Sequence, residues 1–127
     1  MGLFSRNKKQ KDLDNIVMGF LRTEASKLLG IKPNSNEYTE AMSSAAEPIQ
    51  TTFLPNLNKS ILEDVANTFS SISQERVNEL FGEYIFLLFV RFSAISQYVA
   101  AGKVKAEEAT PDILANVIHD QIKALLK

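Results

Sequence analysis

Residues 74–101 read QERVNELFGEYIFLLFVRFSAISQYVAA and contain the densest apolar run of the chain, residues 84–90. Apolar side chains recur through this stretch every three or four residues, the spacing that places them on one face of an α-helix. They are Val77, Leu80, Phe81, Tyr84, Leu88, Phe92, Ile95 and Val99. The pattern predicts a long helix over 74–101, which begins after Ser73 and ends before Gly102.

The middle of this predicted helix is apolar on its other side as well. Phe86, Phe89 and Val90 lie opposite the main apolar face, among polar residues. A helix that is apolar all round is usually covered all round. Either other helices of the same chain cover these three residues, or a second copy covers them. The second arrangement predicts a homodimer that associates through the central helix.

Two charged residues interrupt apolar stripes on different predicted helices. Arg91 lies within the apolar face of the central helix, and Glu24 lies within the stripe of the first helix. Because a buried charge needs a partner, the two side chains are predicted to form an ion pair, unless Glu24 reaches water at the edge of its stripe. Alternatively, Arg91 lies seven residues from both Tyr84 and Tyr98, and these three residues predict a site for an anionic group of a small ligand.

Four further helices are predicted from the same spacing and from typical start and stop residues. They cover about 12–29, 36–53 and 59–72, and a last helix that starts at Thr110-Pro111-Asp112. Pro48 is expected to kink or divide the second of them, because proline lacks the N–H group that a helix uses. No stretch alternates apolar and polar residues as a strand does. The sequence therefore predicts an all-α domain over 12–127, an antiparallel bundle of about five helices around the 74–101 helix.

The charge of the chain is unevenly distributed. Residues 1–11 carry four basic and no acidic residues, a charge of +4, and the remaining 10 basic and 15 acidic residues give −5. The segment is expected to be a flexible basic tail. An alternative is that it rests on an anionic membrane surface through its apolar and basic side chains. These side chains are Leu3, Phe4, Arg6, Lys8, Lys9 and Lys11.

Several classes of protein are excluded by these features. The acidic body argues against a nucleic-acid-binding face. The uncharged run between Glu83 and Arg91 is much shorter than the 20 or so apolar residues of a membrane span. The stretch after Met1 lacks the apolar core of a signal peptide. Cysteine is absent, which excludes disulfides and suits the cytoplasm.

The sequence offers little that could catalyse a reaction. The single histidine, His119, is expected to be a solvated surface residue, because it falls on the polar face of the last helix. Glu75, Glu79 and Glu83 follow one another at four-residue intervals and predict a solvated acidic ridge, with a hard cation as the less favoured alternative. We therefore expect no catalytic residues, metal or cofactor. The predicted function is a non-catalytic interaction or regulatory domain that binds a protein partner or a second copy of itself.

Overall fold

The computed structural model describes residues 2–127, with side chains from residue 12 onward. The described residues form five α-helices and no β-strand, which confirms the predicted all-α class. The helices are α1 (Gly2–Leu29), α2 (Asn36–Pro48), α3 (Lys59–Ile72), α4 (Val77–Ala100) and α5 (Pro111–Leu125). Three shorter elements connect them: the π-helix η1 (Ile49–Phe53) and the 3-10 helices η2 (Leu54–Asn56) and η3 (Ala106–Glu108).

The ends of the long helices follow from local sequence. Gly30 and Gly102 adopt φ values of +70° and +76°, a conformation that terminates a helix without the steric cost that a Cβ atom adds. Ser73, in contrast, does not cap α4. Its backbone N–H donates to Phe69 O at the end of α3, and its hydroxyl accepts from Arg76 N at 3.3 Å. The chain therefore turns at 74–76, and α4 begins at Val77 rather than at residue 74.

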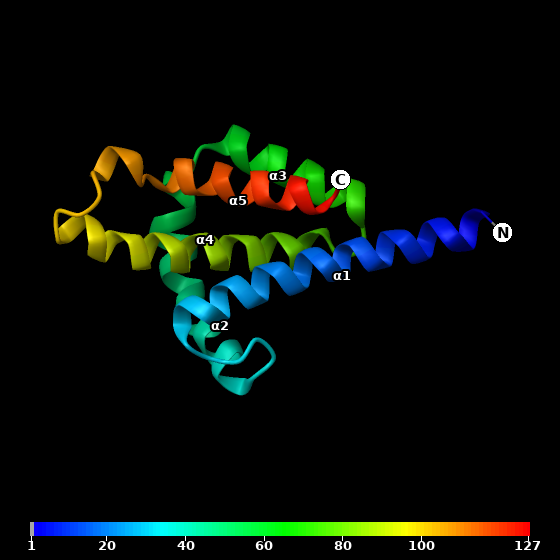
Figure 1. The fold of residues 1–127 in the computed structure, drawn as a ribbon, viewed down its shortest axis with the longest axis horizontal. Coiled ribbons are helices and arrows are strands. Elements are labelled where there is room, and N and C mark those ends of the chain that lie inside the picture. Colours follow the sequence, from blue (N-terminus) through cyan, green and yellow to red (C-terminus); the bar gives the residue numbers. More distant parts are fainter. Residues whose placement is uncertain (1) are drawn as a thin grey trace.

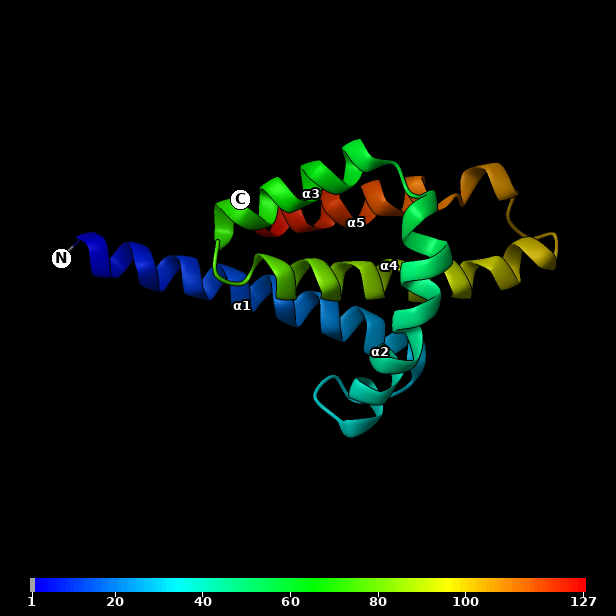
Figure 2. The same ribbon diagram turned by 180° about the vertical axis from the view of Figure 1, so that it is seen from behind.

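Helix α4 contacts α1, α3, α5 and η1. Figures 1 and 2 show α1 along one side of α4, with α3 and α5 together along the other. Both α3 and α5 run opposite to α4, whereas α1 runs in the same direction as α4 (Figure 1). Antiparallel packing, which the sequence led us to expect throughout the bundle, therefore does not apply to α1 and α4.

The segment α2–η1–η2 crosses the face of α4 that carries Phe86, Phe89 and Val90 (Figure 2). We refer to this face as the back of α4. A helix over 36–53 that Pro48 kinks or divides was expected, and Pro48 divides it: the α-helix ends there and the chain continues as the π-helix η1. Proline has no N–H for the preceding turn, so a change of hydrogen-bond pattern is favoured there. The wider turn ends with a bond from Leu54 N to Ile49 O. It also places the buried ring of Phe53 against α4.

The core lies around α4, whose side chains are buried almost continuously from Glu83 to Leu88. Within the described part of the chain, every helix is too short or too polar to cross a bilayer. The start of α1 extends past the other helices in both views (Figures 1 and 2), and α1 begins at Gly2 rather than near Asp12. The predicted membrane-surface side chains of residues 1–11 lie outside the described side chains.

Candidate functional site

The back of α4 is covered mainly by the same chain. Phe86 and Val90 are 2% and 8% exposed. The Tyr38 ring of α2 meets the Phe86 ring edge to face, with ring centres 5.4 Å apart. The Phe53 ring meets Phe89 in the same way at 5.3 Å. Phe86 and Val90 are therefore core residues that their own chain largely covers, and contact with a second copy stays a prediction only for the groove that both line.

The cover leaves an apolar groove beside Phe89, which is only partly buried. The groove has a volume of about 260 Å³ and is lined by Leu28 and Leu29 at the end of α1, by Ala41 and Ala45 of α2, and by the back of α4. On α4 the lining residues are Phe86, Phe89, Val90, Ser93, Ala94 and Gln97. Leu28 and Leu29 remain 47% and 38% exposed. The groove can accept a large apolar side chain from outside the molecule.

The structure does not bring the predicted anion site together. Tyr84 is fully buried, and its hydroxyl donates to Ala115 O of α5 at 3.0 Å. Burial raises the pKa of this hydroxyl well above its ordinary value, because a phenolate would lose its hydration. Tyr98 lies farther along α4 and is 54% exposed. Neither phenol has a contact with Arg91 among the hydrogen bonds of the described residues.

Arg91 is bonded on two sides within the fold. Its Nη2 lies 3.1 Å from Glu24 Oε1, so the ion pair expected from the sequence is present. Its Nη1 donates to Gln121 Oε1 of α5 at 2.8 Å. The guanidinium thus joins α1, α4 and α5. An anionic ligand would have to displace these contacts, which makes the predicted ligand site unfavourable.

A second ion pair between α1 and α4 has a more deeply buried carboxylate. Arg22 Nε lies 3.1 Å from Glu83 Oε2, and the Tyr38 hydroxyl donates to the same oxygen at 3.1 Å. Glu83 is only 4% exposed. Burial, followed by the nearby Glu83 carboxylate, raises the pKa of Tyr38 far above its ordinary value. The hydroxyl therefore stays protonated and remains a donor to Glu83.

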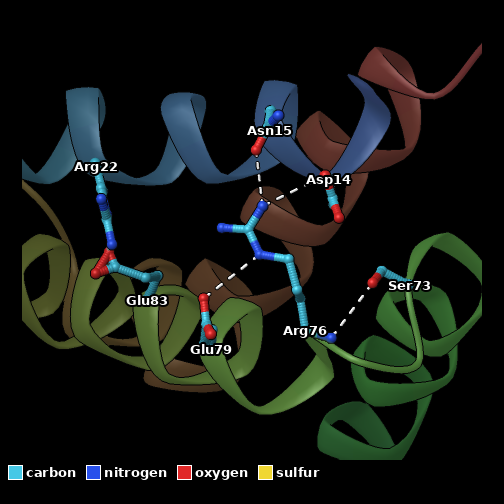
Figure 3. A network of polar contacts seen from close by, with 7 residues as sticks. All are labelled: Asp14, Asn15, Arg22, Ser73, Arg76, Glu79 and Glu83. Atoms are coloured by element: carbon cyan, nitrogen blue, oxygen red, sulfur yellow. Dashed lines mark hydrogen bonds and ion pairs between the residues drawn. The ribbon is translucent and has the colours of Figure 1, made fainter. Parts of the chain in front are cut away.

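A third contact joins the beginning of α4 to α1. Arg76 Nη1 lies 3.4 Å from Asp14 Oδ1 and donates to Asn15 Oδ1 at 2.7 Å, while Nε donates to Glu79 Oε2 at 3.4 Å. Figure 3 shows these contacts beside the Arg22–Glu83 pair. Asp14 is 2% exposed. We refer to the pairs Asp14–Arg76, Arg22–Glu83 and Glu24–Arg91 as the charge row.

The predicted acidic ridge is not continuous. Glu83 is buried and paired with Arg22, whereas Glu75 is exposed and the Glu79 side chain is 63% exposed. The reason is that α1 packs over Glu83 but leaves the earlier two residues toward solvent. No three histidine, aspartate or glutamate side chains come together as a metal site in the part of the chain with described side chains.

His119 is buried, contrary to the expectation of a solvated residue. Helix α3 packs over the polar face of α5 at this position. His119 is 8% exposed, and its Nε2 lies 2.8 Å from Thr68 Oγ1. Burial lowers the pKa of the imidazole, and the positive charge of Lys123 lowers it further, partly offset by Asp120 and Asp64. The neutral imidazole is therefore favoured in the folded chain.

Replacing His119 by glutamine is expected to reduce the loss of stability in acid. The pKa of His119 is lowered on folding, so the unfolded chain binds the proton more readily. The stabilisation that this histidine contributes is complete above its ordinary pKa of 6.5 and declines as the pH falls through the lower pKa of the folded state. Urea unfolding of the native chain and His119→Gln between about pH 5 and pH 8 measures the difference, because other groups titrate equally in both. If the free energy of unfolding changes with pH equally in the two chains, the prediction is contradicted.

Comparisons with known proteins assign no family to this chain. Protein-family models, curated proteins and solved structures were each compared with it, and none of the three comparisons found a match. No ligand, activity or partner is therefore carried over from another protein. The groove behind α4 and the contacts between α1 and α4 remain the basis for inferring function.

Proposed function

We propose that this chain is a small non-catalytic interaction domain that self-associates, with the groove behind α4 as its contact surface. The observation that carries the proposal is the groove of about 260 Å³, at whose rim Leu28 and Leu29 are 47% and 38% exposed. Apolar surface that is concave and partly open to water gains free energy when a partner covers it.

The polar groups of the protein support a non-catalytic role. Arg22, Arg76 and Arg91 each contact a carboxylate of the same chain. The single histidine is held against Thr68. These groups stabilise the helix arrangement, and among the described residues that line the groove only Ser93 and Gln97 have polar side chains. A site of this composition recognises shape and apolar surface and has no nucleophile paired with a base.

The remaining properties fit a cytoplasmic protein that does not bind nucleic acid. The chain has no cysteine, as is usual where thiols are kept reduced. Residues 12–127 carry a charge of −5, from 10 basic and 15 acidic residues. An acidic body of this kind repels the phosphates of nucleic acids.

Arginine in place of Ala94 is expected to prevent self-association without unfolding the chain. Ala94 lies in the groove and is only partly buried, so a long side chain can fill the groove while its charge stays in water. Light scattering across a range of protein concentrations should show a native dimer, and dissociation that is at least about tenfold easier in the variant.

Ala100→Arg is the matched control, because Ala100 is exposed on the same helix and does not line the groove. It should associate as the native chain does. Circular dichroism checks that both variants remain helical. A native chain that stays monomeric at every concentration, or a folded Ala94→Arg chain that dimerises normally, contradicts the proposed function.

A further inference from the structure

The N-terminal segment of a second copy fits the groove behind α4. We infer that residues 1–11 of one copy dock there, with Leu3 and Phe4 in the apolar part and the basic residues against α2. The inference rests on the proposed self-association and names the segment that makes the contact. It combines three observations: the direction of α1, the apolar lining of the groove, and the charge of α2.

The direction of α1 requires the segment to come from another molecule. Helix α1 has 28 residues and ends at Leu29, at the groove. At 1.5 Å per residue it is about 40 Å long. Its start extends past the other helices, away from α2 (Figure 1). The segment therefore cannot reach the groove of its own chain while α1 is helical.

The composition of the segment matches the groove. Leu3 and Phe4 are two adjacent large apolar residues, and Arg6, Lys8, Lys9 and Lys11 follow them without an acidic residue. The groove is lined largely by leucine, alanine, phenylalanine and valine side chains. Burial of one large apolar side chain strengthens association by roughly tenfold or more. Two such residues therefore provide an anchor, and the basic residues provide orientation.

The charges on α2 complement the basic residues. Helix α2 forms one wall of the groove through Ala41 and Ala45, and it carries Glu37, Glu40 and Glu47, all exposed. The helix contains no basic residue. The basic residue nearest to α2 in the sequence is Lys32, in the turn before the helix. A segment with a charge of +4 is thus attracted to this side of the groove.

A reciprocal exchange gives a closed dimer. If each copy places its start in the groove of the other, the two α1 helices run in opposite directions around a two-fold axis. Such an interface uses the same surfaces on both copies and does not extend into filaments. The arrangement requires two grooves and two N-terminal segments per dimer. A substitution in the groove or in the N-terminal segment therefore weakens both contacts of the dimer.

The first test removes the apolar anchor without changing the charge of the full chain. Leu3→Gln combined with Phe4→Gln is expected to weaken dimerisation at least about tenfold, measured by light scattering. The matched control is Asn7→Ala combined with Gln10→Ala, which alters two residues of the same segment and should leave the dimer unchanged. A folded Leu3→Gln, Phe4→Gln chain that dimerises normally overturns the inference.

The second test exchanges the charges. Lys8→Glu with Lys9→Glu should weaken the dimer about fivefold at low salt, the effect of two exposed ion pairs. Adding Glu37→Lys and Glu40→Lys to that chain should restore the affinity, because both sets of charges are then reversed in sign and still attract each other. A further loss instead of restoration overturns the inference, because it shows that the two sets of charges do not meet.

A labelled peptide of residues 1–11 provides a direct probe. It should bind the full-length Leu3→Gln, Phe4→Gln chain, whose grooves are free, and should lose binding when Ala94→Arg is added.

If Ala94→Arg abolishes the native dimer but the segment variants do not, the groove binds another surface of the second copy and only this inference fails. If the segment variants lose only their binding to phosphatidylserine vesicles, the segment contacts membranes and the inference is overturned.

Discussion

Glutamate in place of Phe86 is expected to unfold the chain rather than release a folded monomer. The ring is 2% exposed and packs against Tyr38. Loss of the ring alone costs about 3–5 kcal/mol. Glutamate also buries a charge one turn from the buried carboxylate of Glu83, and an unpaired buried charge is strongly unfavourable. The sum is a large part of the ~5–15 kcal/mol by which domains are stable.

Circular dichroism and urea unfolding measure this effect. Ala100→Glu is the control, since it introduces the same charge at an exposed position of the same helix, and it should remain within about 0.5 kcal/mol of the native chain. A Phe86→Glu chain that is helical, cooperative and monomeric would show that the back of α4 faces a second copy rather than α2. The prediction therefore separates the core role of Phe86 from the open groove beside Phe89.

The helices of this protein were predictable because each carries its own periodic signal. Helix α3 has the predicted bounds, and Thr110 Oγ1 caps α5 by accepting from Ile113 N at 3.2 Å. The direction of α1 relative to α4 was not predictable. Periodicity identifies the buried face of a helix but not the helix that covers it. Here the long crossing of α2, η1 and η2 carries the chain to the far side of α4 before α3 begins (Figure 2).

The polar contacts were predictable only where a charge interrupts an apolar stripe. Glu24 and Arg91 both do so, and they form a pair. The apolar pattern of a single helix does not mark Asp14, Arg22 or His119 as buried or paired. Neighbouring helices bury or pair them in the folded chain. One signal existed for Glu83, because it directly precedes the apolar run 84–90. The groove depends on how three helices meet and leaves no sequence pattern.

The charge row explains how α1 and α4 keep one alignment. Along α1 the charges are negative, positive and negative at Asp14, Arg22 and Glu24. Their partners, one just before α4 and two within it, have the opposite signs in the same order. Sliding α4 by two turns along α1 would place Arg76 beside Arg22. Like charges in a partly buried contact repel each other, which disfavours the shifted alignment. The row therefore favours the observed parallel alignment over its nearest alternative.

Methionine in place of Arg22 is expected to destabilise the chain by about 3 kcal/mol, because it leaves the buried Glu83 carboxylate without its cation. The value is at the lower end for a buried pair, since the Arg22 side chain is 38% exposed. Lys27→Met is the control. Lys27 pairs with Glu24 at the surface, where its side chain is 71% exposed, and its loss should cost less than about 0.5 kcal/mol.

Replacing the whole buried cluster separates the role of the pair in alignment from its role in stability. A chain with Arg22→Met, Tyr38→Phe and Glu83→Met leaves no polar group of the cluster unpaired, so its stability should return to about that of the native chain or exceed it. Urea unfolding measures the three steps. If the triple variant is as unstable as Arg22→Met, the ion pair itself contributes net stability. If it recovers stability but shows a broader, less cooperative transition, the pair contributes mainly by fixing the alignment of α1 and α4.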